Sequence, residues 1–279
     1  DVFPDRKALG GAPTNFAFHC QQLGHEAISV SAIGRDTLGE EIKAELQARQ
    51  LPTILQETDY PTGTVQVTLS ATGSPTYEIS EGVAWDHIAF TDELRALAQR
   101  TDAVCFGSLA QRHEASRTAI LSFLKAMPEG SLRIFDINLR LQYYTRETIH
   151  TSLEHADILK LNDEEVPIVA RLLGLEGDME AVCRQVLTDY SLRAVILTRG
   201  ADGCSIYHEK GSVFHPSACI KVADTVGAGD SFTAGFVSAL LVGRSHLEAV
   251  ALATRVAAFV CSHHGAMPML PSEYRVVEA

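Results

Sequence analysis

Short apolar runs alternate with stretches of helical pattern from about residue 91 onward. The apolar runs cover residues 103–107, 132–137, 157–161 and 193–198. Each is apolar almost throughout, which is typical of strands that helices cover on both faces. The intervening stretches predict helices from about Glu114, near Arg146, over 164–173 and over 179–190. Repeated βα units build a mostly parallel sheet, so we predict an α/β fold whose functional site lies beyond the carboxyl ends of the strands.

The segment from about residue 53 to 90 interrupts this alternation. Residues 62–70 alternate β-branched and polar side chains, 71–75 read as a turn, and 76–80 resume the extended pattern. This predicts an antiparallel hairpin with one solvated face. We interpret it as a lid, formed from about residues 1–9 and 53–90. A surface hairpin without a function is the alternative.

Helical patterns close both ends of the chain, over residues 14–23 and then over 227–241 and 246–262. With 279 residues, of which 46% are hydrophobic, the chain can bury a substantial core. We see no internal repeat, low-complexity tract or linker, and therefore treat residues 1–279 as a single domain.

The overall charge, the longest apolar stretch and the cysteines exclude several classes of partner and site. Lys and Arg number 23 against 35 Asp and Glu, a formal charge of −12 that disfavours nucleic acid as a partner. The longest apolar stretch, from Phe232 to Gly243, is too short to cross a bilayer. The six cysteines form no C-x-x-C pair, which argues against a zinc site and a thioredoxin-like centre. Free, mostly buried thiols in a reducing cytoplasm fit this pattern best.

The strongest local signal is the segment from Asp224 to Gly235, DTVGAGDSFTAG. Its Gly-Ala-Gly turn, residues 227–229, opens a helix whose first turn holds Asp230. Glycines let several backbone N–H groups converge, and the helix N-terminus adds positive potential, so this turn suits phosphate oxygens. Asp230 then lies within reach of a group that attacks the phosphate. Tight helix packing with Asp230 as a cap is the alternative.

Three rival motifs fail on spacing. A dinucleotide fingerprint needs a third glycine where Phe232 stands. A Walker A loop needs the dipeptide Gly-Lys, which occurs nowhere in the sequence. Ser231 follows Gly229-Asp230 as in GDSL-type hydrolases, but no Asp follows Asp230, so the usual downstream Asp–His pair is missing.

A second signature lies near the start of the sequence. It comprises GGAPTN at residues 10–15 with Ala17, followed by IGRDTLG at 33–39. With these two signatures, the chain resembles the PfkB, or ribokinase-like, family of carbohydrate kinases almost end to end. Residues 136–140, 162–165, 198–203 and 265–268 look like further landmarks of that family. The resemblance implies a ribokinase-like three-layer α/β sandwich with a mostly parallel central sheet and a small β-lid.

The resemblance also implies roles in phosphoryl transfer from ATP to a sugar. Asp230 would accept the proton of the attacking hydroxyl. The N–H groups of Gly227, Ala228 and Gly229 would stabilise charge on the transferred phosphoryl group. The residues that would face the sugar are Asp1, Gly11, Asn15, Asn138 and Arg140. For Arg140, a surface ion pair is the alternative.

Cofactor positions follow from the same resemblance. Asn162 and Glu165, the N-x-x-E of the family, would hold Mg²⁺ mostly through water, because Mg²⁺ loses its water reluctantly. Asn162 would thereby also contribute to nucleotide binding. The residues that would border the nucleotide are Thr198, Gly200 and Gly203. The ligands of a monovalent cation such as K⁺ would be Asp224 and the carbonyl oxygens of Val226 and Gly265.

Among family branches, residues 60–69 and 77–86 look most like bacterial fructokinases. The resemblance therefore implies phosphorylation of fructose to fructose 6-phosphate. Ribose, 2-keto-3-deoxygluconate or a nucleoside as acceptor is the nearest alternative, and a catalytically silent sugar-binding protein on the same scaffold is another. Exposed edges of the lid could pair with a second copy, which would give a homodimer.

The sequence departs from the family pattern at two places. Family members begin with a β-strand that ends in an acidic residue ahead of the Gly-Gly segment. Here only Asp1 could be that residue, and we expect the first strand to be missing. Arg255 lies where the family more often has a small-Asn-small run near the adenine, so it would alter nucleotide preference or reach solvent.

Overall fold

The computed structural model describes residues 1–2, 7–69 and 75–277. Its main sheet has six strands in the spatial order β10-β9-β8-β7-β6-β5. Strands β5 to β8 are mutually parallel, whereas β9 and β10 are antiparallel to their neighbours. The strands are β5 (Ala103–Phe106), β6 (Leu132–Asp136), β7 (Ile158–Asn162), β8 (Ala194–Thr198), β9 (Cys204–His208) and β10 (Gly211–His215). The four apolar runs therefore form the parallel strands that the sequence predicted.

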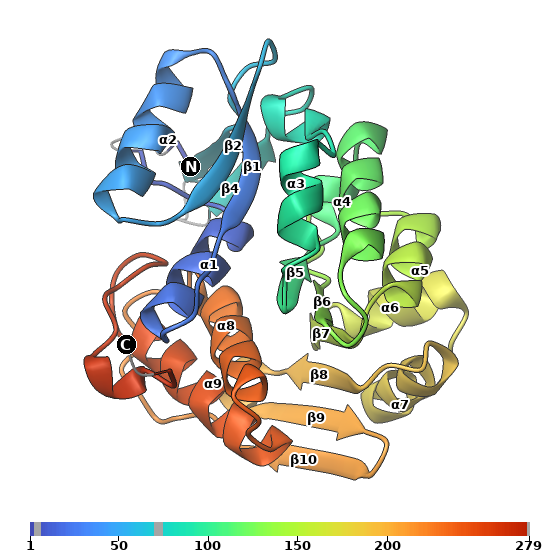
Figure 1. Cartoon of the computed structure of the whole chain (residues 1–279). Coiled ribbons are helices and arrows are strands. Elements are labelled where there is room, and N and C mark those ends of the chain that lie inside the picture. Colours follow the sequence, from blue (N-terminus) through green and yellow to red (C-terminus); the bar gives the residue numbers. More distant parts are fainter. Residues whose placement is uncertain (3–6, 70–74, 278–279) are drawn as a thin grey trace.

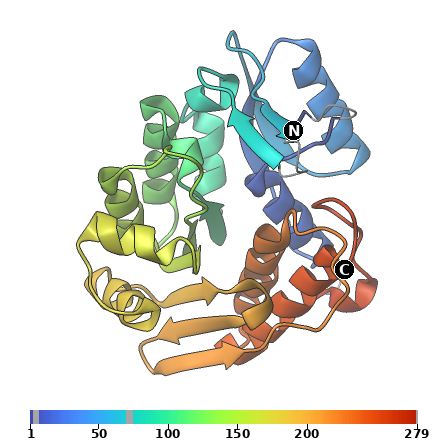
Figure 2. The same cartoon turned by 180° about the vertical axis from the view of Figure 1, so that it is seen from behind.

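Helices cover both faces of this sheet (Figures 1 and 2). One face carries α1 (Ala12–Gln22), α8 (Ala228–Leu241) and α9 (His246–Cys261). The other carries α3 (Asp92–Ala98), α4 (Glu114–Ala126), α5 (Arg146–Glu154), α6 (Val166–Leu173) and α7 (Met179–Asp189). Because successive residues of a strand point to opposite faces, Ile134 and Ile158 pack in the first layer, and Phe135 and Leu159 in the second. The predicted three-layer arrangement is confirmed.

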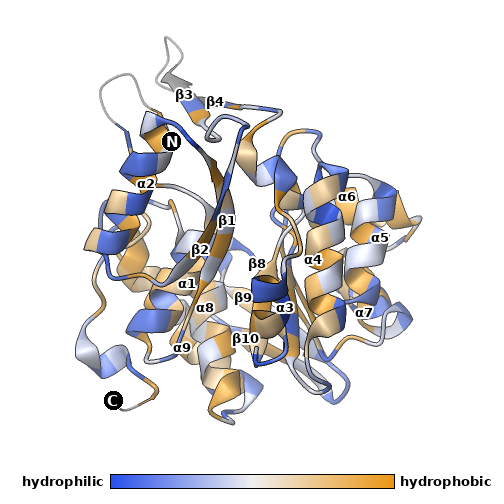
Figure 3. Ribbon diagram, turned by 45° about the horizontal axis from the view of Figure 1, so that its top comes forward, coloured by the Kyte–Doolittle hydropathy of each residue, from blue (hydrophilic) through white to orange (hydrophobic). Residues whose placement is uncertain are grey.

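A separate parallel pair consists of β1 (Ser29–Gly34) and β2 (Thr53–Thr58), joined by α2 (Thr37–Ala48). The side chain of Asp36 caps α2 by accepting the N–H of Gly39 at 2.8 Å. In Figure 3, α2 carries both hydrophilic and hydrophobic residues, as expected for a helix with one packed side. The pairing of β2 with β1 corrects the expectation that the lid begins at about residue 53, because this strand belongs to a βαβ unit.

The predicted hairpin is formed by β3 (Val65–Leu69) and β4 (Pro75–Ile79), which pair antiparallel. Residues 71–74 of its expected turn lie outside the described residues, as do 3–6 of the predicted lid. Val2 joins the hairpin, because its N–H donates to the carbonyl of Val65 at 2.8 Å. After β4 the chain enters a 3-10 turn, η1 (Ala84–His87), which packs beside β1. The remaining 3-10 turns are η2 (Leu109–Gln111), η3 (Gly200–Asp202) and η4 (Ser272–Tyr274).

All six cysteines are free, as predicted from their scatter, and three of them are buried, namely Cys20, Cys183 and Cys204. Within residues 7–69 and 75–277, no helix combines the length and the apolar character that crossing a bilayer requires.

A capping box begins α9, which packs along α8. The hydroxyl of Ser245 accepts the N–H of Glu248 at 3.3 Å, and the Glu248 carboxylate accepts the N–H of Ser245 at 2.9 Å. We expect Ser245→Ala to lower the free energy of unfolding by about 1 kcal/mol, because it leaves helix N–H groups without this acceptor. Urea denaturation of both proteins measures the change. An unchanged midpoint would show that the box does not contribute.

Candidate active site

The first turns of α8 and α1 bring Asp230 and Asn15, the main predicted residues, together. Asn15 on α1 is buried, and its Nδ2 donates to Oδ2 of Asp230 on α8 at 2.8 Å, across 215 positions of sequence. The other side-chain atom of Asn15, Oδ1, is buried and has no hydrogen-bond partner among the described residues. A buried acceptor without a donor is unfavourable, so this oxygen is suited to a hydroxyl group of a ligand.

Burial and nearby charges together determine the pKa of Asp230. The pKa of Asp230 is raised to about 6, first because burial removes water from the carboxylate and second because Asp136 is negatively charged. The hydrogen bond from Asn15 and the positive charges of Lys160 and Arg140 oppose this rise. A carboxylate with this pKa is mostly ionised at pH 7 and still basic enough to take a proton from an alcohol in a transition state.

The Gly-Ala-Gly turn lies directly before Asp230. Gly227 is the N-cap of α8 and adopts a left-handed conformation with φ of +77°. A Cβ atom on this residue would lie 2.6 Å from the Cβ of Ala266, so the loop at 265–266 packs closely against the turn. The Ala228 N–H donates to the Thr225 carbonyl at 3.2 Å, whereas the N–H groups of Gly227 and Gly229 have no acceptor among the described residues. As far as the described residues go, two of the three predicted donors are thus available to a ligand.

A buried ion pair that the sequence did not predict lies beneath the turn. Lys160 on β7 donates to both carboxylate oxygens of Asp136 on β6, at 3.0 and 3.1 Å. The hydroxyl of Thr233 on α8 also donates to Asp136, at 3.0 Å. The sequence signal was present, since Lys160 interrupts the apolar residues of 158–161, and a buried charge needs a partner.

On the sugar side, the structure places Asp1 against the Gly-Gly segment, because a Cβ on Gly10 would lie 2.7 Å from Oδ2 of Asp1. Asn138 follows β6 and has a left-handed φ of +41°, unusual for a residue other than glycine. Arg140 is exposed, and its Nη1 donates to the carbonyl of Leu139 at 3.0 Å. In the described part of the chain no acidic side chain pairs with Arg140, so the surface ion pair considered above is not observed. Gly11 is the exposed N-cap of α1.

The two residues expected to hold Mg²⁺ form a reciprocal cap at the end of β7. The Asn162 N–H donates to Oε2 of Glu165 at 2.8 Å, and the Glu165 N–H donates to Oδ1 of Asn162 at 2.9 Å. The other oxygen of Glu165 accepts the N–H of Leu139 at 2.8 Å. Burial raises the pKa of Glu165. Since backbone donors already engage these oxygens, the pair suits a hydrated ion better than direct coordination.

On the nucleotide side, Thr198 ends β8, and Gly200 and Gly203 flank the turn into β9. Gly203 has a φ of +87°, and a Cβ there would lie 2.4 Å from the carbonyl oxygen of His215. The close approach of β10 therefore accounts for a glycine at 203 without a ligand. Arg255 lies over the ring of Tyr274, with 4.8 Å between guanidinium carbon and ring centre. It is exposed, which favours the second of the two roles considered for it.

The three residues expected to bind a monovalent cation lie close together. The Asp224 carboxylate accepts the N–H of Val226 at 3.0 Å and the N–H of Gly265 at 3.0 Å. This carboxylate therefore ties the segment before α8 to the loop after α9. No cluster of three His, Cys, Asp or Glu side chains suited to a metal is found in the part of the chain that the structure describes.

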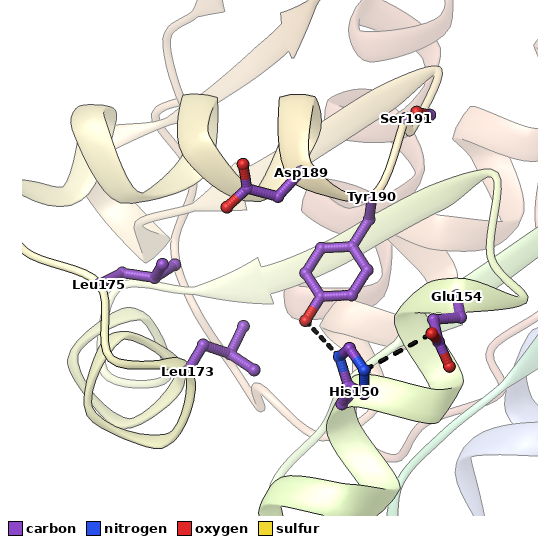
Figure 4. Close-up of a pocket in the computed structure, with 7 residues that line it drawn as sticks. All are labelled: His150, Glu154, Leu173, Leu175, Asp189, Tyr190 and Ser191. Carbon is purple, nitrogen blue, oxygen red and sulfur yellow. Dashed lines mark hydrogen bonds and ion pairs between the residues drawn. The ribbon is translucent and has the colours of Figure 1, made fainter.

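A pocket of about 490 Å³ lies elsewhere, among the ends of α5, α6 and α7 (Figure 4). Within it, His150 Nδ1 lies 2.7 Å from the hydroxyl of Tyr190, and Nε2 lies 3.5 Å from Glu154. Ser191, which also lines it, precedes β8, so the pocket is at the amino ends of the strands. None of the predicted site residues lines it. Ligands of α/β sheets bind at the opposite edge, where Asp230 lies.

Comparison with known proteins decides the family. Residues 4–273 match the pfkB family carbohydrate kinase. This protein belongs to the pfkB family of carbohydrate kinases. Its ribokinase-like α/β fold, with a mostly parallel sheet between two helical layers, is that of its structural neighbours.

Three relatives show which activities occur in similar proteins. The ATP-dependent 6-phosphofructokinase of Thermoanaerobacterium thermosaccharolyticum is 28% identical over 95% of this pfkB-family kinase and 83% of its own length. The uncharacterized sugar kinase PH1459 of Pyrococcus horikoshii, solved with ATP, has a TM-score of 0.82 and 28% identity over 94% of this chain and 85% of that one. The fructokinase of Vibrio cholerae, solved with fructose, ADP and calcium ion, has a TM-score of 0.78 and 25% identity over 97% and 92%.

Proposed function

We propose that this pfkB-family kinase transfers the γ-phosphoryl group of ATP to the 6-hydroxyl of fructose. The observation that carries the proposal is the Asp230 carboxylate, which Asn15 holds at 2.8 Å at the start of α8, beside the N–H groups of Gly227 and Gly229, for which the described residues provide no acceptor. A base next to a cluster of main-chain donors suits the attack of an alcohol on a phosphorus atom.

Each group in the site would have a separate task. Asp230 would accept the hydroxyl proton as the oxygen attacks. The N–H groups of residues 227–229 would stabilise the charge on the phosphoryl oxygens, with Ala228 turning its N–H away from Thr225 to do so. The free oxygen of Asn15 would accept a hydrogen bond from the sugar. Magnesium, when bound, would neutralise phosphate charge, and Asn162 and Glu165 would hold it through water.

The other residues that the family resemblance assigns to the site would surround these groups. Asp1, Gly11, Asn138 and Arg140 would face the sugar. Thr198, Gly200 and Gly203 would border the nucleotide, and Asp224, Val226 and Gly265 would hold a monovalent cation such as K⁺. We further propose that the kinase acts in the cytoplasm, since its cysteines are free.

The fructokinase solved with fructose and ADP supports fructose as the acceptor. The relative named 6-phosphofructokinase makes fructose 6-phosphate the main rival. ADP release in the presence of Mg²⁺ should therefore be measured against fructose, fructose 6-phosphate, ribose, 2-keto-3-deoxygluconate and a nucleoside. We expect fructose to give the highest kcat/KM. Release stimulated by another acceptor and not by fructose would refute the fructokinase assignment while leaving the kinase chemistry intact.

The pH dependence of kcat/KM should report the base. Because the pKa of Asp230 is about 6 and the ionised form accepts the proton, activity should rise with pH through this value and level off above pH 7. At pH 5, we expect kcat/KM to be roughly a tenth of its plateau. Initial rates at low fructose concentration between pH 5 and 9 measure this. A flat profile over that range would contradict the assignment of Asp230.

We also propose that two copies pair through the β3–β4 hairpin. In the described residues Val2 pairs with the outer edge of β3, whereas the outer edge of β4 carries backbone groups that can pair with a second copy. Light scattering coupled to size-exclusion chromatography would give the mass in solution. A single species of about 30 kDa at all concentrations would exclude this dimer.

A further inference from the structure

We propose that Lys160 is a positioning residue that keeps Asp230 in its charged, proton-accepting form, and that Asp136 holds the ammonium group of Lys160 against the phosphate turn. The proposal rests on the function proposed above, in which Asp230 is the base. Lys160 belongs to none of the family motifs, whereas Asp136 is the first residue of the 136–140 landmark but was assigned no role there.

The sheet itself brings the pair together. Asp136 and Lys160 are direct partners in the parallel register of β6 and β7, so their side chains project from the same face. Both are buried, with 6% and 8% of their surface exposed. The ammonium group donates to both carboxylate oxygens and has no third acceptor in the described part of the chain. The third N–H of the ammonium group is therefore without an acceptor among these residues.

The ammonium group of Lys160 lies next to the phosphate turn, residues 227–229. A Cβ atom on Gly229 would lie 2.9 Å from Nζ of Lys160, so the ammonium group lies directly beneath the backbone of the turn. Thr233 reinforces this contact, because its hydroxyl, which donates to Asp136, is also 2.9 Å from the carbonyl oxygen of Gly229. The ion pair therefore lies against the turn from the side of the sheet.

Burial of an ion pair is poor evidence of a contribution to stability. Removing two charges from water costs several kcal/mol per ion in real proteins, and well-packed apolar residues often replace such pairs without loss. An apolar pair on β6 and β7 would match the neighbouring residues Ile134 and Ile158, which are fully packed. The presence of charges here is better explained by what they do to the adjacent carboxylate.

The charged groups near Asp230 come from several elements. Asp136 on β6 raises the pKa of Asp230, whereas Lys160 on β7 and Arg140 after β6 lower it. Cys105 on β5 also feels the Asp230 charge, but burial raises the pKa of this thiol well above its ordinary value, so it stays neutral. Burial tends to lower the pKa of Lys160, but the charge and hydrogen bond of Asp136 together with the charges of Asp230 and Glu165 raise it, so the ammonium persists.

Without Lys160, two carboxylates would share a buried site, and Arg140 would remain of the two cations that lower the pKa of Asp230. Like charges at short range cannot both remain ionised, so a proton would be taken up at a higher pH. Removal of Asp136 instead would leave Lys160 unneutralised beside Asp230 and would have the opposite effect. The pair therefore predicts shifts of opposite sign for its two members.

The test is the pH profile of kcat/KM for fructose in Lys160→Met, Asp136→Asn and the double variant. We expect the acid limb of K160M to move up by about one pH unit, which lowers kcat/KM about twofold at pH 7 and about fivefold at pH 6, while the value at pH 9 stays within about threefold of wild type. The acid limb of D136N should move to lower pH. The acid limb of the double variant should lie near that of wild type. K43M, which removes a lysine paired with Glu40 and Glu57 on the surface, is the matched control and should leave the limb unmoved.

A uniform loss of kcat/KM at every pH in K160M would show a merely structural role and overturn the proposal. If K160M does not fold, D136N carries the test, because an unmoved limb in that variant has the same meaning. Titration of carboxyl-¹³C-labelled aspartates by NMR, with the Asp230 signal assigned from D230N, reports the shift without turnover. Inactive wild-type protein would refute the proposed function, whereas an unshifted Asp230 signal in folded K160M would refute only this inference.

Discussion

Asp230→Asn lowers kcat for fructose phosphorylation by about 10²- to 10⁴-fold, because the amide cannot accept the hydroxyl proton in the transition state. The substitution keeps the shape of the side chain and the contact with Asn15, which is 2.8 Å away in the native protein. Fructose and ATP should therefore still bind, with dissociation constants within a few-fold of wild type. A coupled assay of ADP release gives kcat, and calorimetry gives the binding constants.

Asp178→Asn is the matched control for this substitution. Asp178 is also at the start of a helix, where it caps α7 by accepting the N–H of Ala181 at 2.8 Å. It lies outside the site, so its change to Asn should leave kcat unaltered. If D230N retains turnover within a few-fold of wild type, Asp230 is not the base.

Gly227→Ala should lower kcat by about 10²-fold or more, since loss of a single oxyanion donor has effects of this size. The added Cβ would lie 2.8 and 2.9 Å from backbone atoms of Ala266, which cannot rotate away as a side chain could. The turn must then shift, and its N–H groups move from the phosphoryl oxygens. Steady-state rates at saturating ATP and fructose measure the loss.

Gly243→Ala separates this effect from backbone strain alone. Gly243 has a φ of +78°, almost the same as the +77° of Gly227, but a Cβ there would meet nothing within 4 Å. Both alanines therefore carry the left-handed strain of about 1–2 kcal/mol. Only G227A should lose activity, while thermal melts should show a lower midpoint for both variants. Equal losses of kcat in the two variants would contradict a special role for the turn.

Much of the fold could be predicted because each parallel strand is a short apolar run. Residues 132–137 and 157–161 contain almost only side chains that suit a strand covered on both faces, and they form β6 and β7. The strand that pairs with Thr53–Thr58 could not be predicted in the same way. Its pattern fits a half-buried strand in either a lid or a βαβ unit, and only its parallel pairing with β1 distinguishes them.

The candidate site, like the fold, could be predicted only in part. Family signatures named Asn15 and Asp230, which the packing of α1 on α8 brings into contact. The Asp136–Lys160 pair was missed, because strand neighbours depend on register, which local sequence does not specify. For Glu165, the motif indicated a metal-binding carboxylate but not that backbone N–H groups would engage both of its oxygens.

The most direct measurement incubates wild-type protein and D230N with ATP, Mg²⁺ and fructose labelled with ¹³C at carbon 6, and records the ¹³C spectrum. Phosphorylation of the 6-hydroxyl splits this carbon signal by coupling to phosphorus. We predict that wild type converts the label to the split signal and that D230N leaves it unsplit over the same time. An unsplit signal with active wild type, or equal splitting with both proteins, would contradict transfer to this hydroxyl by the Asp230 site.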